Sequence, residues 1–384
     1  MIELESMNKC SGCASCALTC PQNCITMVPD KMGFYYPKVE TEQCIQCGLC
    51  RSRCPAYSGN VSEVADHIAE AFAVIGKDEK IRKNSSSGGI FYYVARYIIS
   101  QNGVIFGAAF DDNCHSVRHI AVDSPDGLDK LQGAKYAQSE IGESYLSARY
   151  YLDQGKPVLF TGTPCQIAGL KAFLNKDYSN LYLLDIVCHG VPSPAVWDDY
   201  LTQLEKQYSG KVTRVSFRDK TNGWKNYLLR IDMDNGLVYS GDRINDLFMR
   251  GFLHNCYLRL SCYECNYKRV EHGADITLGD FWGIENICPT FYDDKGTSLV
   301  IVSSPKGRFL LEQIQEKVCV QNVALDIVIP FNQYIVKSAN YTLSRKKFEN
   351  DFRLKPIMNV LKKHCSMSKY QSLKRKIKSR LNQK

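Results

Sequence analysis

The cysteines are the residues whose spacing is most able to do chemistry. The pattern C-x2-C-x2-C-x3-C-P occurs twice near the N-terminus, at residues 10–21 and 44–55. This is the run that binds two [4Fe–4S] clusters, with the fourth cysteine of each run ligating the other cluster. Zinc is the alternative, but its ligands usually come as separated Cys-x-x-Cys pairs. We therefore expect one cluster on Cys10, Cys13, Cys16 and Cys54, and the other on Cys44, Cys47, Cys50 and Cys20.

A second group of cysteines follows two hundred residues later. Cys256, Cys262 and Cys265 are spaced C-x5-C-x2-C, which predicts a third metal site with a fourth ligand from elsewhere. We expect that ligand to be Cys188, with Cys165 as the competing choice. Spacing alone leaves zinc open, because Cys-x-x-Cys serves it well, although two clusters upstream favour a third redox cluster. Cys24 belongs to neither N-terminal set and is expected to be a buried structural thiol.

Composition indicates a globular chain. With 384 residues, 45% hydrophobic and 23% charged, it can bury a sizeable core and form two or three domains. No apolar run reaches the roughly 18 residues of a membrane-spanning helix, and the start "MIELESMNKC" does not resemble a signal peptide. Disulfide scaffolds are usually short chains that lack a core. We therefore expect a reducing, cytoplasmic setting.

The net charge of +8 is concentrated at the C-terminus. Lys362 to Lys384 holds nine Lys or Arg and no acid. An apolar stripe at helical spacing runs through this segment, which would let it lie on an anionic membrane surface or dock a partner. The alternative is a solvated, partly frayed terminal helix. The segment is neither rich in aromatic residues nor rich in Gly, so we expect no nucleic-acid binding. The stripe consists of Tyr370, Leu373, Ile377 and Leu381.

The middle of the chain alternates strand-like and helix-like segments. Residues 69–76 predict a strand and 88–101 a helix, and residues 103–110 form a short apolar run. Residues 156–174 and 181–204 each predict a strand, a turn and a helix. This alternation predicts an α/β fold in which loops gather at the strand ends and bind ligands. The N-terminal cysteine module should form a separate α+β, ferredoxin-like unit, with a polar linker near residues 58–66.

Two loops in this region suit an anion. "NSSSGG" precedes a helix, so free backbone N–H groups would face a phosphate. In "TGTPC", Thr163 is a plausible N-cap and Pro164 a plausible first helical residue. A serine-rich turn before a helix is often only a cap. No Walker lysine pattern or intact Rossmann fingerprint is present, which argues against ATP hydrolysis and a conventional NAD site.

Six segments together resemble the coenzyme F420 hydrogenase/dehydrogenase beta-subunit family. They occur in order across roughly residues 70–330: "IRKNSSSGG", "LQGAKYAQS", "TGTPCQIAGLK", "DIVCHGVPSP", "FRDKTNGW" and "DITLGDFWGI". The resemblance implies an oxidoreductase containing FAD and iron–sulfur clusters, in several members preceded by a ferredoxin domain. We expect four regions: a ferredoxin domain at 1–60 from the cysteine runs, the two parts of an FAD-binding domain at 70–150 and 151–335 from the resemblance, and a basic helical tail at 340–384 from its charge.

The resemblance also implies site residues. The FAD phosphates would bind at the serine loop "NSSSGG", and the segments around Lys135 and Thr161 would line the same ligand. The third cysteine group would hold a [4Fe–4S] cluster. Cys165 could ligate this cluster or contact the flavin. Lys135 has an alternative as a solvated surface lysine. The FAD residues implied are Ser85, Ser86, Ser87, Gly88, Gly89, Lys135, Tyr136, Thr161, Gly162 and Thr163.

These features predict electron transfer between the clusters and FAD to reduce, or oxidise, a small organic substrate. Coenzyme F420 and a polysaccharide-pathway metabolite are the candidates. The alternative is an electron-transfer subunit that serves a redox partner protein or soluble carrier. His189 is our candidate proton donor and His254 a second, although a lone histidine is more often a structural hydrogen bonder. Asp280 and Trp282 are expected to shape the site.

Overall fold

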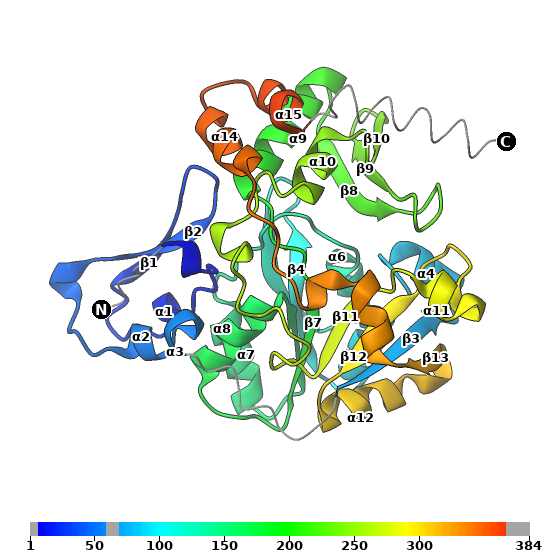
Figure 1. Cartoon of the computed structure of the whole chain (residues 1–384). Helices are drawn as coiled ribbons and strands as arrows, with labels where there is room; N and C mark the ends of the chain where they lie inside the picture. Colours follow the sequence, from blue (N-terminus) through cyan, green and yellow to red (C-terminus); the bar gives the residue numbers. More distant parts are fainter. Residues whose placement is uncertain (1–6, 59–68, 366–384) are drawn as a thin grey trace.

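The computed structural model describes residues 7–58 and 69–365. The ferredoxin-like N-terminal module lies beside a larger α/β body, and the C-terminal helices pack against two helices next to a further small sheet (Figure 1). The polar linker and the apolar stripe of the basic tail lie outside the described residues. Among the described helices, none is long and apolar enough to cross a membrane.

The N-terminal module is built from short elements around its cysteines. Strands β1 (Ile25–Pro29) and β2 (Tyr35–Val39) form an antiparallel pair, and three one-turn helices carry or follow the cysteine runs. Residues with positive φ precede two of these helices, Ala14 at 62° and Gly48 at 76°. Such turns let three neighbouring thiols converge on one point. The helices are α1 (Ser15–Leu18), α2 (Leu49–Ser52) and α3 (Pro55–Ser58).

An eight-stranded mixed sheet forms the centre of the larger body. The strands β3, β4, β6, β7 and β11 all run in the same direction, so their carboxyl ends share one edge of the sheet. Loops at that edge are where ligands bind in α/β sheets. In sheet order the strands are β13 (Val318–Val323), β3 (Glu70–Gly76), β12 (Ser298–Val302), β11 (Ile276–Asp280), β7 (Leu181–Ile186), β6 (Val158–Gly162), β4 (Val104–Phe110) and β5 (Val117–Val122).

Alternate residues of the central strands enter different cores. Ile105 and Leu159 pack with α5 (Ile90–Ser100) and α12 (Pro305–Gln313), whereas Phe106 and Phe160 pack with α7 (Ser144–Asp153) and α8 (Pro164–Leu174). Successive strand side chains point to opposite faces, so both faces of the sheet are covered. The remaining helices near this sheet are α4 (Glu79–Asn84), α6 (Leu128–Leu131), α11 (Ile284–Ile287) and α13 (Leu325–Val328).

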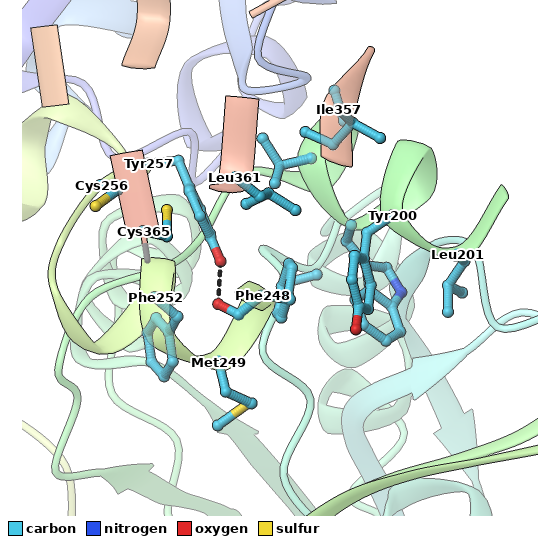
Figure 2. Packing of buried hydrophobic residues seen from close by; sticks show 14 of the residues in the cluster. Tyr200, Leu201, Phe248, Met249, Phe252, Cys256, Tyr257, Ile357, Leu361 and Cys365 are labelled. Atoms are coloured by element: carbon cyan, nitrogen blue, oxygen red, sulfur yellow. Dashed lines mark hydrogen bonds between the residues drawn. The ribbon is translucent and has the colours of Figure 1, made fainter. Parts of the chain in front are cut away.

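A second body is centred on a three-stranded antiparallel sheet. Its core is aromatic, with Trp197, Phe217 and Phe248 fully buried. Figure 2 shows Phe248 accepting a hydrogen bond at its carbonyl from the Tyr257 hydroxyl, among side chains of the C-terminal helices. Its elements are β8 (Val212–Asp219), β9 (Leu228–Met233), β10 (Val238–Asp242), α9 (Pro194–Tyr208), α10 (Leu247–Leu253), α14 (Leu343–Asp351) and α15 (Ile357–Cys365).

The structure confirms the predicted mixed α/β class with a ferredoxin-like N-terminal region. The strand predicted at 69–76 is β3, and the helix predicted at 88–101 is α5. The predicted strand, turn and helix over 156–174 are β6 and α8, and those over 181–204 are β7 and α9, which continues to Tyr208.

Candidate functional site

Two thiol sets lie in the N-terminal module. We define the first set as Cys10, Cys13, Cys16 and Cys54. Because the other three lie near Cys16, charge on them would raise the pKa of the Cys16 thiol. Burial is the larger cause of that raised pKa, and it also raises the pKa of Cys13 to about 12. These are the four residues expected at one cluster. Buried thiols of this kind are stable as thiolates only beside positive charge, which iron would supply.

The second set, defined as Cys20, Cys44, Cys47 and Cys50, lines one small cavity. Cys24 lines the same cavity, and its Sγ lies 3.4 Å from Cys20 Sγ. Cys24 is 2% exposed, as expected of a buried thiol. It nevertheless lies against the predicted second cluster, and the sequence pattern alone gave no sign of this.

A third thiol group surrounds a larger cavity at the carboxyl edge of the main sheet. Cys165 begins α8 after β6, Cys188 follows β7, and Cys262 and Cys265 come from the loop after α10. Burial raises the pKa of Cys262 to about 12 and that of Cys188 above its ordinary value. Lys268 Nζ donates to the Cys188 carbonyl oxygen and so places a positive charge beside the group. We call these four residues the third set.

The structure does not bring Cys256 into the third set. Cys256 is 1% exposed and packs in the aromatic core beside Cys365 of α15 (Figure 2). Its backbone N–H donates to the Gly251 carbonyl oxygen at 2.8 Å, which closes the end of α10 and directs the side chain into that core. The expected trio is therefore corrected: Cys165 and Cys188 both face the cavity, and Cys256 does not.

The arrangement of the thiols around the cavity suits a cluster. In a [4Fe–4S] cubane each thiolate binds a different iron, so the four sulfurs stand around the whole cluster. Four thiols from three segments around one cavity fit that group.

His189 faces the same cavity but is held by protein partners. Its Nε2 lies 2.6 Å from Asn255 Oδ1, and its ring stacks on Tyr334 at 4.2 Å. Burial lowers its pKa to about 4, so the ring is neutral near pH 7. The assignment as a proton donor stays a prediction, and this geometry favours positioning. The second candidate, His254, ends α10, and burial lowers its pKa too.

The predicted anion loop packs tightly on its neighbours. Ser87 Oγ donates to the Thr297 carbonyl oxygen at 2.6 Å, and the Gly88 N–H donates to Ser298 Oγ at 2.9 Å. Ser85 Oγ donates to the Ile81 carbonyl oxygen at 2.8 Å. These hydroxyls therefore hold the loop in place. The first N–H groups of α5, which have no partner within the helix, are the groups left to meet a phosphate.

The "LQGAKYA" segment closes over this loop. The Ala134 N–H donates to Ser86 Oγ at 2.8 Å, and Lys135 Nζ donates to the Gln132 carbonyl oxygen at 2.9 Å. Burial lowers the pKa of Lys135 to about 7. The structure thus brings the serine loop and Lys135 together, as the resemblance implied, and the alternative of a fully solvated lysine does not hold.

The "TGTPC" segment joins the anion loops to the third set. Thr163 caps α8 reciprocally with Gln166, and Thr161 Oγ1 donates to the Phe106 carbonyl oxygen at 2.9 Å. Thr163 Oγ1 lies 3.1 Å from Cys165 Sγ. His119 Nε2 lies 2.9 Å from the Thr161 carbonyl oxygen and donates to it. Burial lowers the pKa of His119 to about 4.

The "FRDKTNGW" and "LGDFWG" segments together form a largely buried ion pair. Arg218 pairs with Asp280 and lies 3.9 Å from the centroid of the Tyr227 ring. Trp224 and Trp282 stack at 5.1 Å beside this pair. Tyr136 lies 3.5 Å from Arg218, with its ring 4.7 Å from that of Phe252. Asp280 and Trp282 thus both contact Arg218, and their role in shaping the site stays a prediction.

Lys220 and Arg218 were not among the predicted site residues. Lys220 Nζ donates to three backbone carbonyl oxygens, those of Arg82, Ser87 and Lys295, at 2.8–2.9 Å. Its hydrogen bonds therefore hold the anion loop in place. Both residues belong to the "FRDKTNGW" segment, so the signal was present in the sequence.

Two family models match the chain. Residues 155–326 match the C-terminal part of the coenzyme F420 hydrogenase/dehydrogenase beta subunit, and residues 9–57 match a 4Fe-4S dicluster domain. Residues 155–326 are thus similar to the C-terminal domain of this beta-subunit family. The dicluster domain implies two [4Fe–4S] clusters, for which the first and second sets provide the eight cysteines.

Two known proteins are similar to this chain over most of its length. A coenzyme F420-dependent sulfite reductase of Methanocaldococcus jannaschii is 23% identical over 356 residues, covering 91% of this chain and 52% of that protein. The chain thus spans about half the length of the curated relative it matches. A chain of the F420-reducing [NiFe] hydrogenase complex from Methanosarcina barkeri shares the fold, with a TM-score of 0.51 and 16% identity, covering 75% of this chain and 93% of that one.

Proposed function

We propose that this beta-subunit relative is an iron–sulfur flavoprotein oxidoreductase that reduces or oxidises a small organic substrate. The third set, Cys165, Cys188, Cys262 and Cys265, would hold a [4Fe–4S] cluster, and the anion loops would hold FAD. When bound, FAD links the one-electron chemistry of clusters to two-electron substrate chemistry. We place the protein in the reducing cytoplasm, where thiols of three sets stay unpaired.

The observation that carries this proposal is the continuity of the "TGTPC" segment. Within five residues it passes from the Thr161 and Thr163 hydroxyls of the anion region to Cys165 of the thiol cavity. A flavin held at this edge would therefore lie next to the third set, which is the arrangement that electron exchange requires.

The residues around the proposed flavin site would orient and shield it. The N-terminal N–H groups of α5 and the half-buried Lys135 favour an anion such as the pyrophosphate of FAD. The stacked Trp224 and Trp282, with Tyr136, form an apolar wall over the Arg218–Asp280 pair. Such a wall excludes water from the reacting ring and strengthens the electrostatic field of that pair.

The candidate substrates are coenzyme F420 and a polysaccharide-pathway metabolite. The test is anaerobic turnover by the FAD-loaded protein with reduced methyl viologen, measuring F420 by its visible absorbance and metabolites by mass spectrometry. We expect at least one substrate to be consumed at a rate that depends on added FAD. Bound FAD that viologen reduces but that passes electrons to no tested compound would contradict the F420 and metabolite assignments.

A second candidate is an electron-transfer subunit. It is favoured because the curated relative is about twice as long as this chain and because the structural relative is one chain of a complex. In that case the protein would exchange electrons with a redox partner protein or carrier, and turnover would appear only when that partner is added.

A further inference from the structure

A cysteine of the first set packs directly on the helix that carries the third set. Gly169 follows Cys165 by four residues, so both lie on one face of α8, about one turn or 6 Å apart. A methyl group on Gly169 would lie 2.6 Å from Cys13 Cβ and 3.0 Å from its Sγ. The absence of a side chain at Gly169 therefore allows Cys13 to rest on α8 one turn from Cys165.

Tyr267 lines the third-set cavity at the place where the N-terminal module meets it. It follows Cys265 by two residues and is half-buried. The same cavity is lined by Cys165 and Cys265 of the third set and by Ser11 and Ala56, which flank cysteines of the first set. An aromatic side chain thus lies in the wall that the two sets share.

The third-set cavity is walled in part by the N-terminal module. Ser11, between the first two cysteines of the first set, and Ala56, two residues after its last, line it together with Cys165 and Cys265. Arg259 holds this contact in place, donating to the Cys10 carbonyl oxygen at 2.7 Å and to Gln138 Oε1 at 3.0 Å.

The second set faces the other way. Its cavity is lined entirely by residues 20–50 of the module. Cys47 is exposed, and the neighbouring Ile45 is 60% exposed. The two sets of the module are therefore not equivalent: the first packs against α8, whereas the second includes the exposed Cys47.

We propose that Tyr267 and the Cys165–Gly169 turn of α8 form the electronic bridge between the first set and the third, and that the exposed second set is where an external carrier exchanges electrons. This inference rests on the proposed function. Each passage moves one electron, so the occupant of one set is oxidised and that of the next is reduced. No bond forms and no proton moves.

The first test uses the holoprotein and electron paramagnetic resonance after reduction with dithionite. Cys16→Ala should remove the cluster of the first set and Cys50→Ala that of the second, each with loss of about four irons. We expect magnetic coupling between the third cluster and the module to persist in Cys50→Ala and to vanish in Cys16→Ala. The opposite pattern would overturn the route.

A second test leaves every cluster in place. Tyr267→Leu is compared with Tyr267→Phe, which keeps the ring, in stopped-flow reduction of bound flavin by a reduced bacterial ferredoxin. We expect the fast phase to be lost in Tyr267→Leu and kept in Tyr267→Phe, with equal iron content. Equal rates in both variants would contradict the bridge. If the unmodified protein held no third cluster or flavin, the proposed function itself would fail.

Discussion

Cys256 and Cys165 illustrate what spacing can and cannot predict for a single residue. The ferredoxin runs are local, so eight ligands could be read from the sequence with their crossed pairing. The third set draws on three separate segments, and the nearest cysteine in sequence, Cys256, turns into the aromatic core instead. Only the packing of α10 against α15 decides that outcome, and periodicity does not encode it.

The revised third set predicts a difference between two neighbouring cysteines. Cys262→Ser should lose about four irons per chain, because one cubane loses a ligand. Cys256→Ser, its matched control, should keep the full complement, since Cys256 does not line the cavity. Iron and acid-labile sulfide analysis of both variants, purified anaerobically, measures this. Equal iron loss in the two would restore Cys256 as a ligand.

His119 predicts an acid sensitivity. Its folded pKa of about 4 lies below the ordinary 6.5, so the folded state binds fewer protons between these values. Stability from this group is therefore present above pH 6.5 and lost as the pH falls toward 4, up to about 3 kcal/mol. His119→Gln, which can still donate to Thr161, should flatten the curve of unfolding free energy against pH over that window. An unchanged curve would show that other groups dominate.

At the scale of elements, the strand–turn–helix units were predictable and their hydrogen bonds were less so. Thr163 and Pro164 occupy the predicted cap and first-turn positions of α8 because a capping box is a local pattern. The serines of the anion loop were expected to meet phosphate. In the structure Ser85 and Ser87 donate to backbone carbonyls instead, and Ser87 does so to Thr297, directly before β12 and 210 residues away in sequence.

Lys220 provides a test of how the anion loop is held. Lys220→Met removes the ammonium group that donates to three backbone carbonyl oxygens, two of them part-buried. A buried acceptor left unsatisfied costs about 1–3 kcal/mol. We expect FAD affinity to fall by about tenfold or more, equivalent to at least ~1.4 kcal/mol. Lys295→Met is the control, because it removes a nearby exposed cation and keeps the three bonds of Lys220. Flavin fluorescence titration of the apoprotein measures both. Similar affinity for both variants would contradict this role.

At the scale of the whole molecule, the docking of the module on α8 could not be predicted. Arg259 is 1% exposed and binds the carbonyl oxygens of Cys10 and Tyr35, more than two hundred residues earlier. The Arg259 guanidinium also lies 4.3 Å from the centroid of the Tyr36 ring, which adds a cation–π contact to these hydrogen bonds. Such long-range pairs produce no pattern in a single sequence. The α/β class and the N-terminal module could be predicted, because hydrophobic periodicity and cysteine spacing are local patterns.

Arg259 therefore predicts how firmly the module is attached. Arg259→Met should loosen it, because hydrogen bonds to a charged group contribute about 1.5–3 kcal/mol each. Hydrogen exchange at residues 9–16 should become faster while that of β6 and α5 stays unchanged. Arg353→Met, which removes an exposed arginine bonded to Lys31, is the control and should leave both regions as they are. Uniform acceleration throughout the protein would indicate general destabilisation instead.

The most direct test of three clusters beside a flavin is the cofactor content of the protein purified without oxygen. Iron, sulfide, zinc and FAD are measured together with the visible spectrum before and after dithionite. About twelve irons and one FAD per chain, with a brown colour that bleaches on reduction, is the predicted result. About eight irons with zinc, or with no flavin, would contradict the account and confine redox chemistry to the N-terminal module.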